Sequence, residues 1–489
     1  MKRSFYLAAL VILAAQKKAN TQQPFNLDTS FRLNAPARYI NDILPLPDGD
    51  VIVSGQIKFP GEWSYHSGVR LNSDGSRDLA FAEAYMGNKL KPWNGKIYAG
   101  NGAGVRRNWY DGNLDASFDM ANSPYYGPIQ AGDYHVYPDG RILMSGAHLL
   151  QDSIRGFEGI YNLIWFSNTG YLDTTRTHRS TNGGVIYEIH ELPDGKFLLS
   201  GYFSAYEGVP VPCIIRVHPD GALDPTFQSA IGVGQAQTFT VLADGRILAS
   251  GLMKIDANSP DSLNLVRLMP DGALDPTFNT SARATSAQTG AFQDIWHTRL
   301  PDGRIVMHGN FDHISGIPRG GIAMFDADGN LLNDAFTGDG CGIFLDGGQA
   351  ELQGTVGMSM APDGSYYIFG AYYGYDDGTT NDTLQRFVSR LYGLDVGVSD
   401  PANGTSFGLS IYPNPARTWV TVDHHPRGGM KSASLMVRDL MGREVARIPF
   451  NDQTLQVYWD VRTVPPGTYL IELRSGNARQ AFQRLVVQP

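Results

Sequence analysis

The chain of 489 residues has few cysteines and, after its first 15 residues, no long apolar run. Its two cysteines, Cys213 and Cys341, belong to no CxxC pair and to no Cys/His spacing that binds zinc. We therefore expect two separately buried thiols, no metal site and no bound cofactor. Beyond residue 15 nothing approaches the ~18 apolar residues that a membrane helix requires, so we expect no membrane span.

Acidic residues outnumber basic ones, but the excess is unevenly distributed along the chain. The formal net charge is −9. Residues 1–18 carry four basic residues and no acid, residues 409–489 carry a net charge of +4, and the remainder carries −17. A region this acidic repels phosphate backbones, so we expect no nucleic-acid partner. The 42% of hydrophobic and 18% of charged residues are typical of a folded globular chain.

The first residues have the pattern of an export signal. Lys2 and Arg3 precede an apolar stretch at 4–15, which is too short to span a bilayer but has the length of a signal-peptide core. We expect a signal peptide at 1–19. The alternative is a buried N-terminal helix.

Glycine, tyrosine and phenylalanine are abundant, at 56, 24 and 23 residues, and they occur in a repeated pattern. The phrase RVHPDGALDPTF at 216–227 returns almost unchanged as RLMPDGALDPTF at 267–278. A companion element, Asp-Gly usually preceded by Pro and followed by a short apolar run and Gly, recurs about every 52.5 residues. It occurs at 46–55, 137–146, 192–201, 242–251, 300–309 and 361–370, with a degenerate copy, KPWNGKIYAG, at 91–100.

Each repeat predicts antiparallel strands, because Asp-Gly between apolar runs is a strong hairpin signal. Two such turns in about 50 residues give four strands, which is one blade of a β-propeller. The chain also opens and closes on complementary half-repeats, FNLDTSF at 25–31 and FVSRLYGLD at 387–395. We expect an all-β fold with a seven-bladed propeller at 24–396, closed by its N-terminal strand. Six or eight blades, or an open β-solenoid, are the alternatives.

An arginine and an aspartate recur at fixed places in the repeat. A residue present in every blade cannot define one active site, so we expect these pairs to tie strands together and to cap turns. The arginines are Arg70, Arg107, Arg216, Arg267 and Arg390, and the aspartates are Asp28, Asp78, Asp115, Asp173, Asp224 and Asp275.

The repeat resembles the delta-60 repeats of secreted bacterial proteins, over about residues 25–395. The stretch after a Gly/Ser/Pro/Asn-rich linker at 397–408 resembles the C-terminal sorting domain of type IX secretion in Bacteroidetes. This second resemblance covers residues 409–489. It rests on YPNPA at 412–416, VRDLMGREV at 437–445 and VPPGTYLIEL at 464–473. Its motif residues are Tyr412, Pro413, Asn414, Pro415, Gly442, Gly467 and Tyr469.

The sorting-domain resemblance implies an address rather than a chemistry. It implies that the type IX machinery is a partner, and that the chain crosses the inner membrane by its signal peptide and then reaches the outer-membrane surface. The short alternating strands of this stretch predict a small Ig-like β-sandwich. The alternative is an ordinary adhesive Ig-like module.

The sequence contains no H-E-x-x-H motif and no S-x-D-x-G-x-T-W box of sialidase-type propellers. Two acidic stretches, FDADGNLLND at 325–334 and YDDGTTND at 375–382, are expected to be a turn and a solvated loop rather than calcium sites. His135 and His190, each four residues before a Pro-Asp-Gly aspartate, are expected on innermost strands without a catalytic role.

Aromatic residues in the variable loops are the candidate ligand contacts. In a propeller such loops gather on one rim, and aromatics with a polar group suit sugar or peptide contact, although several could instead pack beneath the loops. The candidates are Trp63, Tyr65, Tyr206, Tyr373 and Tyr375. We expect a secreted or surface-held, non-catalytic binding or scaffold protein with a glycan or protein ligand. The alternative is a secreted hydrolase or lyase, acting on glycans or peptides at a site in the propeller channel.

Overall fold

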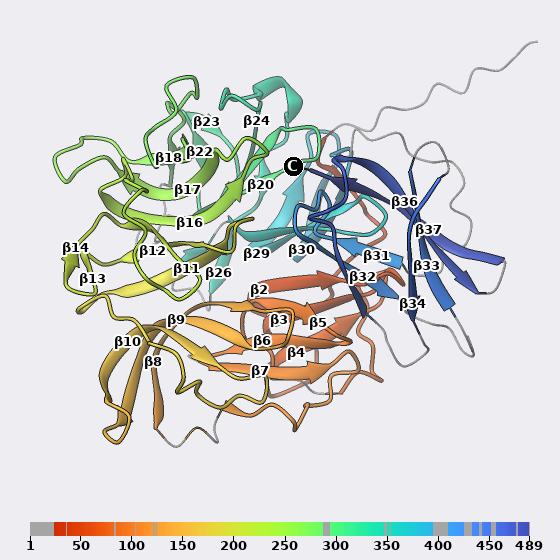
Figure 1. Cartoon of the computed structure of the whole chain (residues 1–489). Coiled ribbons are helices and arrows are strands. Elements are labelled where there is room, and N and C mark those ends of the chain that lie inside the picture. Colours follow the sequence, from red (N-terminus) through yellow and green to blue (C-terminus); the bar gives the residue numbers. More distant parts are fainter. Residues whose placement is uncertain are drawn as a thin grey trace, which may run out of the picture.

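The computed structural model describes residues 24–35, 37–82, 85–102, 104–120, 123, 125–286, 294–346, 350–352, 354–394, 409–424, 433–439, 443–450, 456–475 and 478–488. The predicted signal peptide at 1–19 and linker at 397–408 lie outside these residues. Apart from one 3-10 turn, η2 (Asn333–Ala335), the regular elements of this part of the chain are all strands (Figure 1). The predicted all-β class is therefore confirmed.

The strands of the repeat form antiparallel sheets in chain order. The first six are β2 (Ala37–Pro45) with β3 (Val51–Ile57) and β4 (His66–Leu71); β5 (Leu90–Trp93) with β6 (Lys96–Asn101) and β7 (Gly104–Trp109); β8 (Tyr126–Val136) with β9 (Ile142–Asp152) and β10 (Phe157–Phe166); β11 (Val185–Glu191) with β12 (Phe197–Tyr202) and β15 (Ile214–Val217); β16 (Val233–Val241) with β17 (Ile247–Lys254) and β18 (Leu263–Leu268); and β20 (Ile295–Arg299) with β21 (Ile305–Gly309) and β24 (Ile322–Phe325).

The last sheet of the repeat region includes the N-terminal strand. It contains β1 (Asn26–Leu27), β30 (Asn381–Tyr392), β29 (Tyr366–Asp376), β28 (Gly354–Met360) and β25 (Gly340–Cys341). Short strands also pair within the loops. β13 (Ala205–Tyr206) pairs with β14 (Val209–Pro210), and β26 (Phe344–Asp346) pairs with β27 (Ala350–Leu352). β22 (His313–Ile314) pairs with both β19 (Ala284–Thr285) and β23 (Ile317–Pro318).

The Asp-Gly turns have the predicted chemistry. Between β16 and β17, the N–H of Leu242 donates to the carbonyl of Arg246 at 2.7 Å, and Gly245 adopts φ +84°. The carboxylate of Asp244 accepts the N–H of Arg246 at 3.1 Å and so caps the turn. A residue with a Cβ is strained at such a φ, which explains the Gly.

The predicted fourth strand of the repeat is not a strand. After β15 the chain returns through a single bridge, Val217 to Leu223, and then turns away. Asp224 directs this departure, because its carboxylate accepts the N–H of Thr226 at 3.0 Å and its carbonyl accepts the N–H of Phe227. Pro225 has no N–H to continue a ladder.

The repeated Arg and Asp tie neighbouring segments together, as predicted. The N–H of Asp224 donates to the carbonyl of Arg216 at 2.8 Å, and the Arg216 Nε lies 2.8 Å from the Asp224 carboxylate. The same ion pair joins Arg107 to Asp115 at 2.5 Å, Arg267 to Asp275 at 2.7 Å and Arg70 to Asp78 at 3.7 Å. The carboxylates of these aspartates are held in ion pairs that stabilise the fold, so they are not available for catalysis.

In the last sheet the same tie is made by the opposite end of the chain. The N–H of Asp28 donates to the carbonyl of Arg390 at 2.8 Å, and the two side chains lie 3.6 Å apart. β1 pairs with β30, with Asn26 opposite Tyr392 and Leu27 opposite Leu391. Residues 25–31 thus supply the segment that the final half-repeat lacks.

Asp377 holds this N-terminal strand in place. Its carboxylate accepts the N–H of Leu27 at 2.9 Å and the side chain of Asn26 at 3.1 Å, and only 3% of the residue is exposed. The stretch at 375–382 was expected to be a solvated loop. That prediction is wrong for Asp377, which is a buried anchor.

Neighbouring sheets are joined through the serine of the Ser-Gly pair. Fully buried Ser54 donates to the carbonyl of Asn88 at 2.8 Å, and Ser200 accepts the N–H of Ala236 at 2.9 Å; each bond reaches the next sheet. The following Gly is required because the innermost strand crowds it. A Cβ on Gly201 would lie 2.1 Å from the carbonyl oxygen of Val185.

The sheets close into a circle. β8 contacts β11, β11 contacts β16, β16 contacts β20, and β20 contacts β28. β28 in turn contacts β2, which contacts β5, and the Tyr134 hydroxyl of β8 donates to the carbonyl of Lys89 at 2.7 Å. Apolar clusters fill the space between adjacent sheets, so each sheet depends on its neighbours to bury its faces. Where the last sheet meets the first, the cluster includes Phe31, Ile40, Val53, Tyr367, Phe369 and Val388.

The C-terminal residues form two separate antiparallel sheets, drawn in blue in Figure 1. One contains β31 (Leu409–Tyr412), β32 (Trp419–His424) and β35 (Gln456–Asp460), and the other contains β34 (Glu444–Phe450), β33 (Ala433–Asp439), β36 (Gly467–Ser475) and β37 (Ala478–Val487). They share an apolar core that includes Val420, Val422, Leu435, Val437, Ile471, Leu473 and Leu485.

Candidate functional site: a charged cluster on the innermost strands

The first strand of each sheet lies at the sheet's inner edge, and four consecutive sheets place charged side chains at one level of it. We call this group the axial cluster. It consists of Asp42, Lys89, Lys91, Asp133, His135, Glu188 and His190. The corresponding level in the next three sheets is uncharged, with Thr238, Trp296 and Gly357. The charge is therefore gathered on one side of the circle.

Lys89 is the centre of the axial cluster. Its ammonium nitrogen lies 3.0 Å from the Asp133 carboxylate and 2.9 Å from the Glu188 carboxylate, and the three residues come from three different sheets. Lys91 lies 3.4 Å from Asp133. The Asp133 side chain is 2% exposed whereas that of Lys89 is 45% exposed, so water reaches the lysine but hardly reaches the aspartate.

The axial carboxyl groups have different proton affinities. Burial alone would raise the pKa of Asp133, but the ammonium groups of Lys89 and Lys91 outweigh it and lower that pKa to about 2. Burial raises the pKa of Glu188 to about 7 in spite of Lys89. Burial also raises the pKa of Asp42 to about 6, although Asp42 accepts the N–H of Leu90 from the next sheet at 2.7 Å.

The two histidines of the axial cluster are uncharged at neutral pH. Burial, assisted by Lys91, lowers the pKa of His135 to about 3 and that of His190 to about 4. His135 packs edge-on against Tyr137 and Phe197, with ring centroids 4.7 and 5.3 Å away. Aromatic packing of this kind agrees with the predicted structural role. Among the described residues, no group of three His, Cys, Asp or Glu is placed to hold a metal ion.

Another buried histidine makes a testable contribution to pH dependence. His297 is 4% exposed, and its two ring nitrogens lie 2.8 Å from the Ser250 hydroxyl and 2.9 Å from the Thr240 hydroxyl. Burial lowers the pKa of His297 to about 3, whereas an unfolded histidine titrates near 6.5. The unfolded state therefore binds the extra proton, and stability is lost as pH falls from about 6.5 toward 3.

We expect His297→Gln to remove about 2 kcal/mol of the loss in stability between pH 7 and pH 5. Urea denaturation of both proteins at the two pH values measures this difference. Equal pH dependence in the His297→Gln variant and the unchanged protein would contradict the assignment.

The candidate aromatic residues do not share one environment. Trp63 is 96% exposed and Tyr65 is 48% exposed, both in the loop between β3 and β4. Tyr206 is fully buried and donates to the carbonyl of Gly221 at 2.7 Å, and Tyr375 is 1% exposed and donates to the carbonyl of Phe25 at 3.2 Å. The prediction that Tyr206 and Tyr375 lie on an exposed rim is wrong, because both phenols satisfy buried carbonyl groups.

Tyr373 is half-buried, because it packs between Phe344 and Phe387 at centroid distances of 4.8 and 5.3 Å. Trp63 and Tyr65 remain as exposed candidates. Lys58 lies 5.8 Å from the Tyr65 ring, which adds a cation beside the aromatic pair.

The axial cluster was not predicted, although a signal for it exists. Asp42, Asp133 and Glu188 each stand six residues before the turn aspartate of their repeat. Lys89 stands five before Asn94 because the turn of its hairpin is one residue shorter. Aligning the repeats at their turns therefore places these charges at one level.

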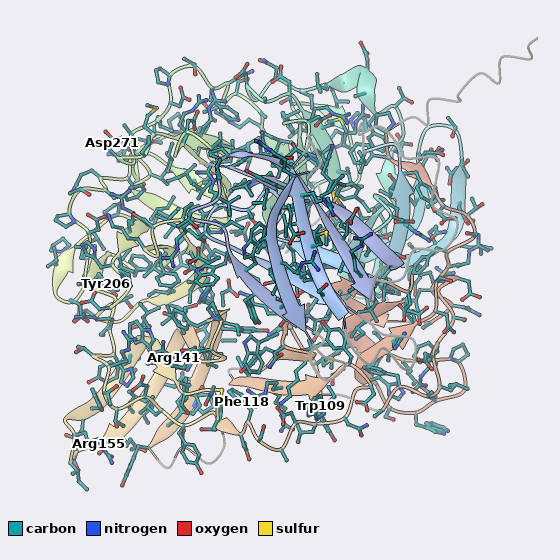
Figure 2. The ribbon with its side chains drawn as sticks, turned by 45° about the vertical axis from the view of Figure 1, so that its right-hand side comes forward. Trp109, Phe118, Arg141, Arg155, Tyr206 and Asp271 are labelled. Carbon is teal, nitrogen blue, oxygen red and sulfur yellow. The ribbon has the colours of Figure 1, made fainter. Side chains whose placement is uncertain are left out.

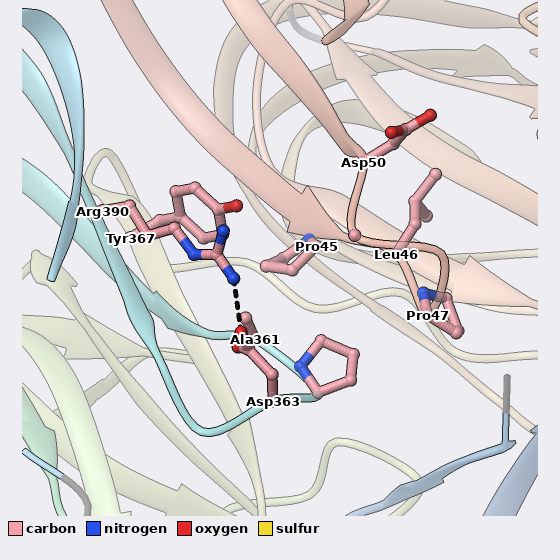
Figure 3. A pocket seen from close by; sticks show the side chains of 10 residues that line it. Pro45, Leu46, Pro47, Asp50, Ala361, Asp363, Tyr367 and Arg390 are labelled. Atoms are coloured by element: carbon pink, nitrogen blue, oxygen red, sulfur yellow. Dashed lines mark hydrogen bonds and ion pairs between the residues drawn. The ribbon is translucent and has the colours of Figure 1, made fainter. Parts of the chain in front are cut away.

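The structure is also hollowed at the seam where the last sheet meets the first (Figure 3). This pocket holds only about 70 Å³, far below the ~300–1,000 Å³ of ordinary ligand sites. It is lined by Pro45, Leu46, Pro47, Gly49, Asp50, Ala361, Pro362, Asp363, Tyr367 and Arg390. Arg390 spans it with an ion pair to Asp363.

The expected sorting motif fastens the first strand of the tail to the last. The Asn414 side chain donates to the carbonyl of Arg484 at 2.6 Å and accepts the N–H of Val486 at 2.8 Å. Pro413 and Pro415 flank it in the exposed turn. The Tyr412 hydroxyl accepts the side-chain N–H of Gln456 at 2.7 Å.

Near the end of the motif, β36 begins at Gly467. Tyr469 is 6% exposed and donates to the carbonyl of Pro465 at 2.6 Å. Gly442 lies outside the described residues.

Two family models match parts of the chain. Residues 410–488 match the secretion system C-terminal sorting domain. Residues 192–227, 242–278 and 300–331 match a domain of unknown function, DUF5122, a β-propeller. The chain is thus a β-propeller protein that carries a secretion sorting tail. More particularly, the tail is a type IX sorting domain, and the protein is exported to the cell surface or secreted.

A comparison with curated proteins gave no match. Among solved structures, Citrobacter koseri AztD is 12% identical, with 86% of this chain and 97% of that chain covered and a TM-score of 0.22. Dimeric latent PorU from Porphyromonas gingivalis is 11% identical, with 77% and 35% covered and a TM-score of 0.16. The BSP domain of a biofilm associated protein is 12% identical, with 96% and 83% covered and a TM-score of 0.16. Similarities this low support no inference. The described residues include no helix long and apolar enough to cross a membrane.

Proposed function

We propose that the propeller is a non-catalytic binding module that the type IX machinery delivers to the cell exterior. The main support for this proposal is Trp63, which is 96% exposed beside Tyr65 on the loop between β3 and β4. Most Trp side chains are buried in their own protein, whereas the Trp63 indole lies in water. A partner surface that covers this indole removes its apolar area from water, which favours binding. Trp and Tyr are also the residues that most often dominate binding energy.

The axial cluster supports binding or structure over catalysis. Lys89, Lys91, Asp133 and Glu188 are paired with one another inside the protein, and Asp42 accepts the backbone N–H groups of Ile43 and Leu90. A hydrolase or lyase needs an acid and a base left free for the substrate. Glu188, with a pKa near 7, is the residue that the alternative of a secreted hydrolase or lyase would use as its acid or base.

The proposal includes the finer architecture. It takes residues 24–396 as a seven-bladed propeller and residues 409–489 as an Ig-like β-sandwich, with 1–19 as signal peptide and 397–408 as linker. The β1–β30 pairing, the Arg390–Asp28 tie and the contact of β28 with β2 support a closed ring. The two-sheet arrangement of the tail supports the sandwich.

Binding is tested with the purified propeller against panels of soluble polysaccharides and extracellular proteins. We expect Trp63→Ala to weaken binding of the retained ligand at least about tenfold, since an anchoring aromatic contributes ~2 kcal/mol or more. Its thermal melt should not change, because the side chain contacts little of its own protein. Tyr171→Ala, at an aromatic that is 50% exposed and lies after β10, is the control.

Unchanged binding by the Trp63→Ala variant would contradict the proposed surface. Catalytic turnover that survives purification and is abolished by Glu188→Gln would favour the enzyme instead.

A further inference from the structure

The hairpin between β5 and β6 differs from the others of the repeat. Its strands pair up to Trp93 and Lys96, so the turn contains only Asn94 and Gly95. Both have positive φ, +45° and +72°, which is the geometry of a tight two-residue Asn-Gly turn. In the hairpin between β16 and β17 the Leu242 N–H still bonds to the Arg246 carbonyl, so its turn contains residues 243–245 and is one residue longer. The degenerate copy of the repeat thus has its own turn shape.

This turn contacts the sorting tail. The N–H of Asn94 donates to the side-chain carbonyl of Gln456 on β35. Gln456 is only 4% exposed, and its amide also binds the hydroxyls of Tyr412 and Tyr458 at 2.7 and 2.8 Å. Figure 1 shows β31 and β32 of the tail near the sheet of β5 and β6, and β35 pairs with β32. In Figure 2, turned by 45°, the blue strands of the tail come to the front. One buried amide therefore joins the propeller to a residue of the sorting motif.

The charges of the two parts favour the same contact. The tail carries +4 and the part of the chain between residues 18 and 409 carries −17. The turns equivalent to the Asn94 turn expose aspartates on the same face of the ring, since every first hairpin ends there. Their side-chain exposures are 40% at Asp48, 54% at Asp139, 57% at Asp194 and 51% at Asp244, and each is paired with a basic residue of its own sheet, namely Arg70, Arg141, Lys196 and Arg246. Such attraction acts over about 10 Å at 0.1 M salt.

We propose that the Asn94–Gly95 turn is a docking site for the chain's own sorting tail. Gln456 recognises the turn, and the opposite net charges of the two parts add a weak attraction. The two-residue turn leaves the Asn94 N–H free to bind outside its own hairpin, which gives the degenerate repeat a function. Because Gln456 also holds Tyr412, docking fixes how the folded propeller presents the sorting motif. A contact this small can be opened by the secretion machinery.

Amide hydrogen exchange tests the docking on the full exported chain. We expect the Asn94 amide to exchange about tenfold faster after Gln456→Ala or after removal of residues 409–489, because one ordinary hydrogen bond is lost. Raising the salt concentration should shift the full chain in the same direction. The turn at 243–246 is the internal control and should not change, and protection of β33 and β36 shows whether the variant tail is folded.

A cysteine pair provides the second test, independent of the effect of Gln456→Ala on tail folding. The Asn94→Cys, Gln456→Cys variant should form an intramolecular disulfide under mild oxidation, whereas Asp244→Cys, Gln456→Cys should not. The native Cys213 and Cys341 are buried and should not compete. Equal Asn94 exchange with and without the tail, or equal crosslinking of the two pairs, would overturn the proposal.

Discussion

Deleting residues 25–32 should unfold the propeller at temperatures where the intact protein is stable. Phe25 and Phe31 are fully buried and Leu27 is 6% exposed, and burial of three such side chains contributes roughly 6 kcal/mol. The deletion also leaves the buried Asp377 carboxylate without two of its donors and Arg390 without Asp28. A loss of this size is comparable with the ~5–15 kcal/mol that stabilises a whole domain.

Circular dichroism melts of the propeller with and without these eight residues measure the effect. The matched control removes eight residues from the predicted linker, 397–404, and should leave the melt unchanged. Arg390→Ala should fall between the two, because it removes the tie but leaves the apolar contacts of Phe25 and Phe31. A truncated protein that melts with the intact one would show that the N-terminal strand does not close the ring.

Removing residues 409–489 should stop export at the periplasm without unfolding the propeller. The described residues of the tail have their own core, and the apolar clusters between the propeller sheets contain no residue of the tail. The Asn94 N–H of the propeller donates to the Gln456 side chain of the tail, and loss of one such hydrogen bond costs only about 1 kcal/mol. The address is lost completely, because the sorting domain is the part that the secretion machinery recognises.

Cell fractionation of the truncated and intact proteins, with protease added to whole cells, measures this change. The intact protein should be accessible on the surface or in the medium, and the truncated protein should be protected in the periplasm. Trp63→Ala is the control, since a propeller surface residue should not alter sorting. Surface exposure of the truncated protein would mean that the tail is an adhesive module and not an address.

Much of the fold follows from the sequence because its determinants are local and repeated. The Asp-Gly turn and the Arg–Asp tie each act within one or two strands, so seven imperfect copies give seven chances to recognise them. Cys213 and Cys341 are confirmed as two separate, buried thiols that form no disulfide. The prediction of a fourth strand is wrong because Asp224 and Pro225 end the ladder after one bridge. This effect of turn chemistry is not visible in the alternation of apolar residues.

The candidate site was less predictable because it depends on neighbours that are distant in sequence. Trp63 and Tyr206 both lie in variable loops, yet one is exposed and the other bonds to a buried carbonyl through the short β13–β14 hairpin. The sequence alone predicts a solvated Asp377, because its hydrogen-bond donors, Asn26 and Leu27, lie at the opposite end of the chain. Pairing of Lys89 with Glu188, 99 positions apart, requires knowledge of how the sheets close around one another.

We propose that the tail directs export of the protein and that the propeller binds a partner at the cell exterior. The most direct measurement grafts residues 409–489 onto a foreign periplasmic protein in a host with type IX machinery and fractionates the cells. The grafted protein should reach the surface or the medium, and the same graft with Tyr412–Pro415 replaced by alanine and glycine should stay in the periplasm. Retention of the intact graft in the periplasm would contradict the claim.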